Sequence, residues 1–129
     1  MLTVKTIRKI RLSVHRDGKP HTAEEAVKML QSLSGKTHRV LTGLTVLDTG
    51  CGKMLTRTVE TQVHIKNLSP AEIQNYVQSE EPLDKAGAYA IQGLGALIVE
   101  KINGDYYNVV GLPLKTLADC LKELDVNLL

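Results

Sequence analysis

One segment, Asp84–Gly95, concentrates the side chains that could do chemistry. It begins with a carboxylate and an ammonium, Asp84 and Lys85, and later offers the carboxamide of Gln92. A carboxamide presents a planar donor and acceptor, which can read the edge of a nucleobase. The glycines of the segment can turn backbone N–H groups toward an anion. A second interpretation stays equally open from the residues alone: the glycines shape a tight connection, and Lys85 pairs with Asp84.

Other candidate motifs fail on spacing. Residues 35–37 and 52–53 match the end of a phosphate-binding P-loop, but Leu30 and Leu47 stand where its first glycine is required. The four histidines show no metal-ligand spacing, and neither Cys-x-x-Cys nor His-Glu-x-x-His occurs in the chain. We therefore expect neither a Walker motif nor a zinc site.

The first part of the chain predicts a strand and then a helix. Apolar and polar residues alternate over residues 10–15, which is typical of a half-buried strand. Thr22 and Glu25 have the spacing of a capping box, and the apolar residues that follow fall on one helical face as far as Leu33. Gly35 is expected to end this helix.

The middle of the chain predicts a hairpin and a second helix. Residues 40–47 and 54–65 are rich in Val, Thr, Leu and Ile, and turn-forming residues separate them at 48–52. Ser69 is followed by a proline and a capping glutamate, so a helix is expected over residues 70–77. Its inward-facing residues are expected to be Ile73, Tyr76 and Val77.

The C-terminal part predicts two more strands and a closing helix. A strand is expected over residues 97–102, a short strand over 107–110, and an amphipathic helix over 114–124. Strands and helices are mixed along the chain, without a linker or an internal repeat. The pattern predicts a single α/β domain over residues 1–129, with a mixed central sheet flanked by helices.

Composition is typical of a water-soluble globular protein. The chain is 43% hydrophobic and 23% charged, and no apolar run approaches the roughly 20 residues that cross a bilayer. The N-terminus lacks the apolar core of a secretory signal, and the two cysteines are far apart. We expect a cytoplasmic protein without a disulfide or a membrane segment.

Basic residues gather near the N-terminus. Residues 5–19 contain six lysines and arginines against a single acid, Asp17. Such an arm can attract phosphates or nucleic acid. A solvated strand face or a loose terminus explains the cluster too, and this interpretation is preferred because charge clusters alone indicate little.

The pattern E-P-x-D-K-A-G-A-Y-x-I-Q-G-x-G, then a strand, G-D-Y-x-N-V-V-G-L-P and an amphipathic helix resembles the C-terminal half of the Maf family. These septum formation inhibitor Maf-like proteins are nucleoside triphosphate pyrophosphatases. The family's spacing is intact from Glu81 to Leu117. Shorter matches, G-K-P at 18–20 and T-G at 42–43, extend the resemblance to about residues 18–124 and leave 1–17 as a diverged basic segment.

The resemblance implies a fold like that of Maf and inosine triphosphatase, shortened at the N-terminus. It also implies hydrolysis of a pyrimidine or modified nucleoside triphosphate to the monophosphate and pyrophosphate. A divalent metal, Mg²⁺ or else Mn²⁺, and a homodimer belong to the same expectation. Neither a membrane nor nucleic acid is an expected partner.

Site residues follow from the same resemblance. Lys19 matches the family's G-K-P lysine in the phosphate pocket and is the expected catalytic residue, while the ligands of the metal stay unknown. Gln92 matches the glutamine associated with substrate choice, and Gly93 adjoins it. Asp84 and Lys85 match the pair beside the pocket. An ammonium there would neutralise the charge that develops on a pyrophosphate leaving group.

The chain departs from the family near its N-terminus. It has neither S-x-S-P-R-R, whose arginines grip phosphate, nor G-A-D-T, which carries the proposed catalytic aspartate. That aspartate would fall near Ile7, within a basic stretch, and Asp17 is the nearest acid. Three explanations are ranked in this order: a truncated or misread chain, a nucleotide-binding relative without catalysis, and an enzyme that uses Asp84 or another acid instead. A nucleic-acid-binding module led by residues 5–16 is the least favoured function.

Overall fold

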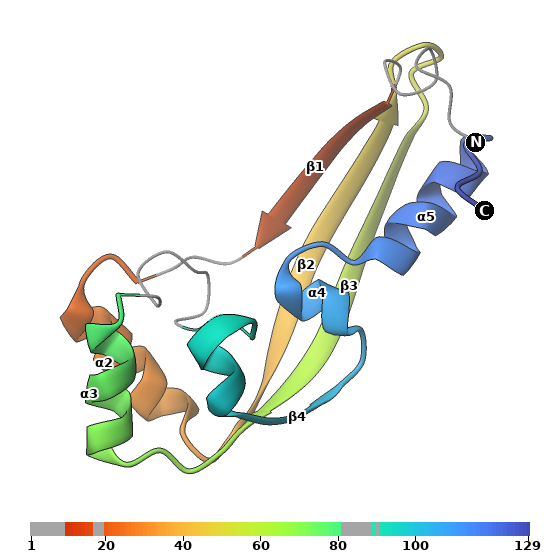
Figure 1. Ribbon diagram of the computed structural model, residues 1–129. Helices are drawn as coiled ribbons and strands as arrows, with labels where there is room; N and C mark the ends of the chain where they lie inside the picture. Colours follow the sequence, from red (N-terminus) through yellow and green to blue (C-terminus); the bar gives the residue numbers. More distant parts are fainter. Residues whose placement is uncertain (1–9, 17–19, 81–88, 90) are drawn as a thin grey trace.

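The computed structural model describes residues 10–16, 20–80, 89 and 91–129 (Figure 1). Strands and helices are mixed through these ranges, as the hydrophobic pattern predicts. The elements in chain order are β1 (Ile10–Arg16), α2 (Ala23–Leu33), β2 (Thr37–Asp48), β3 (Met54–Ile65), α3 (Pro70–Gln78), the 3₁₀ helix η3 (Gly93–Leu97), β4 (Val99–Asn103), α4 (Tyr106–Val110) and α5 (Leu114–Glu123).

The sheet has the strand order β1-β2-β3-β4, and each of these pairs is antiparallel. The α/β class is confirmed, whereas the prediction of a mixed sheet is wrong for the strands that the structure describes. The reason lies in the connections. A tight turn joins β2 to β3, and α2 sits beyond the end of the sheet, so β2 starts near the end of β1 and runs back along it (Figure 1).

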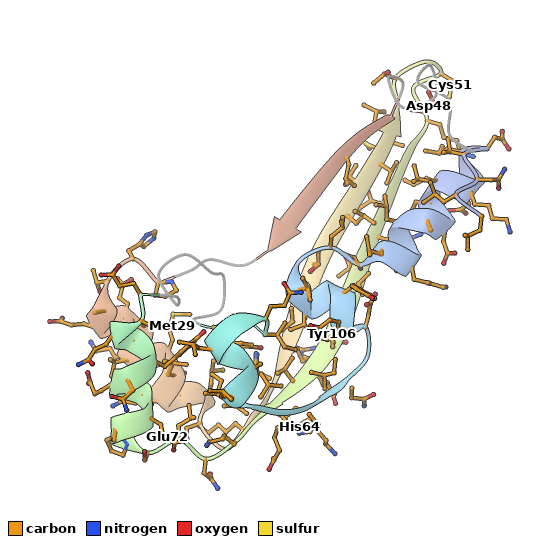
Figure 2. The ribbon with its side chains drawn as sticks, in the orientation of Figure 1. Met29, Asp48, Cys51, His64, Glu72 and Tyr106 are labelled. Atoms are coloured by element: carbon orange, nitrogen blue, oxygen red, sulfur yellow. The ribbon has the colours of Figure 1, made fainter. Side chains whose placement is uncertain are left out.

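The β2–β3 hairpin is the backbone of the molecule. Each strand has 12 residues, and the register places Thr37 opposite His64 and Leu47 opposite Met54. The predicted turn is confirmed: the Asp48 carboxylate accepts the Gly50 N–H at 2.9 Å. Figure 2 shows Asp48 and Cys51 at this tip, far from the end that carries α2 and α3.

The predicted helix starts are confirmed, with one difference. At α3 the Ser69 hydroxyl accepts the Glu72 N–H at 3.1 Å, and the Glu72 carboxylate accepts the Ser69 N–H at 2.9 Å. At α2 the Thr22 hydroxyl accepts the Glu25 N–H at 3.1 Å. The Glu25 carboxylate, however, accepts the N–H of His21 at 2.8 Å, one residue before the cap.

Two apolar clusters hold the helices on the sheet. The larger lies at the α2–α3 end, where the predicted face of α3 is buried together with Ala26 and Leu30 of α2. The smaller lies under α5 and includes Leu44, Val46 and Leu121. Leu114, predicted on the buried face of α5, is 46% exposed.

One predicted strand is a helix, and the predicted start of another strand is wrong. The segment Tyr106–Val110 forms α4, because the Asp105 carboxylate accepts the N–H groups of Tyr107 at 2.8 Å and Asn108 at 3.2 Å. This cap outweighs the strand preference of the tyrosines and valines. The strand expected from residue 97 begins at Val99, because Leu97 still belongs to η3.

Within the described ranges, no helix has both the length and the apolar character needed to cross a membrane. Both cysteines are free thiols: Cys51 is exposed at the hairpin tip, and Cys120 is buried on α5.

Candidate functional site

Gln92 and Gly93 are the predicted site residues that the structure describes. Gln92 is exposed and lies at the start of η3 with an extended backbone, φ −88° and ψ 153°. Gly93 follows with φ +79°, a conformation that favours glycine, so the chain turns sharply here. Lys19, Asp84 and Lys85 lie outside the described residues, and the structure therefore brings none of them together with Gln92.

The Tyr89 side chain contacts strand β2 through His38. Its side chain is 6% exposed, and its hydroxyl is hydrogen-bonded to His38 Nε2 at 2.8 Å. The two rings meet edge to face with centroids 5.5 Å apart. Burial lowers the pKa of His38 below its ordinary value, and the backbone of Val63 opposes this shift. The neutral imidazole of His38 therefore positions the Tyr89 side chain.

His38 shows no metal-ligand spacing in the sequence, and its contact with Tyr89 was not predicted. No local signal identifies the pair, since 51 residues separate His38 from Tyr89 in the chain. The sequence marks this pair only in that both residues fall within the resemblance to the family pattern.

Asn108 is a second residue whose role the sequence did not reveal. It is fully buried, and its Nδ2 group donates to the carbonyls of Val40 and Val59 at 3.2 Å and to Thr61 Oγ1 at 3.0 Å. Thr61 Oγ1 also lies 3.1 Å from both the N–H and the carbonyl oxygen of Asp105. These bonds fasten α4 to the middle of the hairpin, and thereby fix the chain that follows β4.

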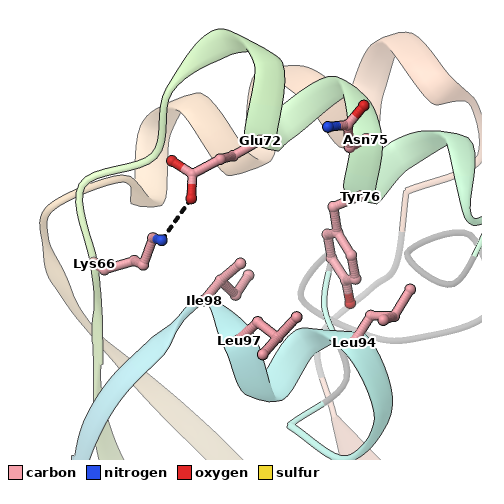
Figure 3. A pocket seen from close by; sticks show the side chains of 7 residues that line it. All are labelled: Lys66, Glu72, Asn75, Tyr76, Leu94, Leu97 and Ile98. Carbon is pink, nitrogen blue, oxygen red and sulfur yellow. Dashed lines mark ion pairs between the residues drawn. The ribbon is translucent and has the colours of Figure 1, made fainter.

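A pocket of about 420 Å³ lies between α3 and η3, the 3₁₀ helix that Gln92 precedes (Figure 3). The aromatic ring of Tyr76 forms one wall, and leucine side chains of η3 face it. Polar groups of α3 and the segment before it form the rim. The lining residues are Lys66, Glu72, Asn75, Tyr76, Leu94, Leu97 and Ile98.

The charges at the rim of this pocket are paired. Lys66 Nζ lies 2.5 Å from Glu72 Oε2, as Figure 3 shows. The hydrogen bond from Lys66, with help from the backbone of Ser69, lowers the pKa of Glu72 to about 2. Glu72 is therefore ionised at neutral pH, and the pair contributes no net charge to the pocket.

The described residues do not offer a metal site. No three His, Cys, Asp or Glu side chains come together anywhere in the ranges that the structure describes. The closest acid to the pocket, Glu72, is already engaged by Lys66 and by the N-terminus of α3. The implied divalent metal has no matching set of ligands here, so no chemical step is assigned to it.

Comparison with known proteins gives a family and close relatives. The family described as Maf-like protein matches residues 3–124, so the match begins upstream of the resemblance at about residue 18. The chain is 52% identical over 111 residues to a dTTP/UTP pyrophosphatase of Methanococcoides burtonii, which covers 86% of the chain and 57% of that protein. It is 56% identical over 113 residues to a dTTP/UTP pyrophosphatase of Thermoanaerobacter sp. strain X514, which covers 87% of the chain and 59% of the relative.

The chain thus spans somewhat more than half the length of the curated relatives it matches. The family match includes Gln92 and Gly93, the residues that line the pocket, and Asn108 with its hydrogen bonds. On these grounds the chain belongs to the Maf-like protein family.

Proposed function

We propose that this chain is a nucleoside triphosphate pyrophosphatase that acts on pyrimidine nucleotides. Water attacks the α-phosphorus, the bond to the oxygen that bridges the α- and β-phosphorus atoms breaks, and the nucleoside monophosphate and pyrophosphate leave. The observation that carries the proposal is the identity of 52% and 56% to relatives named dTTP/UTP pyrophosphatase.

Residue roles in this proposal follow the family pattern. Lys19 would neutralise charge on the departing pyrophosphate, with Asp84 and Lys85 beside it. The exposed carboxamide of Gln92 would contact the nucleotide. The positive φ of Gly93 turns the exposed backbone sharply at this point. The recognition half of this scheme is supported by the lining of the pocket, which includes Leu94 and Leu97 of η3, the helix that Gln92 precedes.

We also propose that the reaction requires Mg²⁺ or Mn²⁺, which would offset the charge of the triphosphate when bound. Its ligands would have to include residues outside the described ranges, since the described ones do not fit a metal. Activity measured with and without excess EDTA decides the point: activity that persists in EDTA contradicts a metal requirement.

The test of the function is pyrophosphate release from a panel of standard and modified nucleoside triphosphates. We expect release with UTP and dTTP to exceed release with ATP and GTP at least tenfold.

Lys19→Ala is expected to lower the rate at least a hundredfold, since the leaving group loses its compensating charge. Release from the wild-type chain that is no faster than from Lys19→Ala would sink the catalytic claim. Calorimetric binding of UTP without any release would then support a nucleotide-binding protein.

A homodimer in the cytoplasm completes the proposal. Exposed leucine side chains on η3 and α5, Leu97 and Leu114, are compatible with an apolar contact between copies. Free thiols at Cys51 and Cys120 suit a reducing compartment. Light scattering on the eluting protein tests the dimer, and a mass equal to the single chain over a hundredfold concentration range rejects it.

A further inference from the structure

We propose that the pocket between α3 and η3 receives the uncharged pyrimidine base of the nucleotide, while the phosphates lie outside it. This inference rests on the proposed function and adds the place where the base is read. Three features of the pocket carry it: its charge balance, its lining and its position.

Charge balance excludes the phosphates from this pocket. A triphosphate requires cations that are free to compensate it. Among the lining residues the single ammonium, Lys66, lies 2.5 Å from the Glu72 carboxylate. A phosphate entering here would have to break that ion pair and would face the released carboxylate. A neutral group meets no such penalty, so the pocket suits the base end of a nucleotide.

The lining suits a flat heterocycle. Tyr76, which is 6% exposed, supplies an aromatic ring to the pocket wall, and aromatic side chains are common contacts of nucleobases. Leu94, Leu97 and Ile98 supply the apolar surface that faces this ring (Figure 3). Asn75 lies at the rim and is exposed, so its carboxamide can donate to a carbonyl oxygen of the base and accept from its N–H. An apolar slot with a few polar groups is typical of small-molecule sites.

Position links the pocket to the predicted recognition residue. Gln92 is the N-cap residue that precedes η3, and Leu94 and Leu97 of this 3₁₀ helix line the pocket. A base seated between Tyr76 and η3 therefore lies within one helical turn of the Gln92–Gly93 backbone.

Uridine is the probe for this site, because it has the base and sugar but no phosphate. We expect a titration followed by ¹H–¹⁵N NMR to shift the amides of Asn75, Leu97 and Ile98 in the wild-type chain. Leu97→Trp should fill the slot and weaken uridine binding at least tenfold. Folding is not at stake, since the Leu97 side chain is 73% exposed. Asn75→Ala should weaken binding at least threefold, since a hydrogen-bonding group is lost.

Met54→Trp is the matched control, since Met54 is also an exposed apolar residue, at 61%, but lies at the hairpin tip. It is expected to bind uridine within twofold of the wild-type chain. Unchanged affinity in Leu97→Trp, amide shifts confined to other regions, or no uridine binding at all would overturn the inference. Adenosine that binds as tightly as uridine would overturn its pyrimidine part.

The failure of this inference can be told apart from failure of the proposed function. Release of pyrophosphate from UTP by a chain whose pocket does not take uridine rejects the inference and leaves the activity intact. Uridine in the pocket of a chain that does not hydrolyse UTP supports the inference and rejects the activity.

Discussion

At the scale of single residues, buried polar side chains join parts of the fold that are far apart in the chain. Asn108 bonds two strands at once, and the His38–Tyr89 hydrogen bond joins Tyr89 to strand β2. Both arrangements join residues far apart in the chain, by 68 residues between Asn108 and Val40 and by 51 between Tyr89 and His38. Local patterns carry no signal for such contacts, and for this reason the sequence did not predict them.

Replacing Asn108 with alanine is expected to lower the free energy of unfolding by about 2–3 kcal/mol. The change leaves the carbonyls of Val40 and Val59 without their side-chain donor in a buried place. Urea denaturation followed by circular dichroism measures the loss. Asn127→Ala, at an exposed residue near the C-terminus, is the matched control and should change the free energy by less than about 0.5 kcal/mol. Equal losses of unfolding free energy in the two variants would contradict a stabilising role of the Asn108 hydrogen bonds.

His38 predicts a dependence of stability on pH. Burial lowers its pKa in the folded state below the unfolded value, so the unfolded chain binds a proton more readily. Its contribution to stability is therefore complete above about pH 6.5 and is lost as the pH falls through the lower folded pKa. Urea midpoints between pH 7.5 and 5.0 should fall in the wild-type chain and fall less in His38→Gln.

The control for this pH series is His21→Gln, at an exposed residue ahead of α2. It should keep the wild-type dependence of the urea midpoint on pH. If His38→Gln keeps that dependence as well, His38 is not its source.

At the scale of elements, the sequence predicted the features that neighbouring residues form and missed those that depend on residues far apart in the chain. The Ser69–Glu72 capping box and the 48–52 turn were predicted because neighbouring residues form them. Helix α4 was missed because its start depends on Asp105, which Thr61 holds from another strand. The pocket was missed for the same reason, since its two sides come from residues 66–76 and 94–98.

Asp105→Ala is expected to destabilise the chain by about 1–2 kcal/mol, because α4 loses the acceptor for two N–H groups. Asp119→Ala removes an exposed aspartate whose partner is Lys115, one turn away on α5, and should cost less than about 0.5 kcal/mol. Thermal unfolding by calorimetry compares the two. A loss for Asp105→Ala no larger than that for Asp119→Ala would mean that the cap does not determine α4.

At the scale of the whole molecule, the antiparallel hairpin carries one apolar cluster at each end. The α/β class was predictable from the alternation of strand and helix signals. Strand direction was not, because it depends on where α2 lies relative to the sheet. The predicted site is divided in the same way: Gln92 and Gly93 are described, and Lys19, Asp84 and Lys85 lie outside the described residues.

The central claim is cleavage between the α- and β-phosphates by a chain that spans somewhat more than half the length of its curated relatives. Phosphorus NMR of UTP incubated with the purified chain and Mg²⁺ tests it most directly, because it identifies both products. The proposal predicts that UMP and pyrophosphate appear in equal amounts, and that Lys19→Ala slows both together. UDP with inorganic phosphate, or UTP that stays intact, would contradict it.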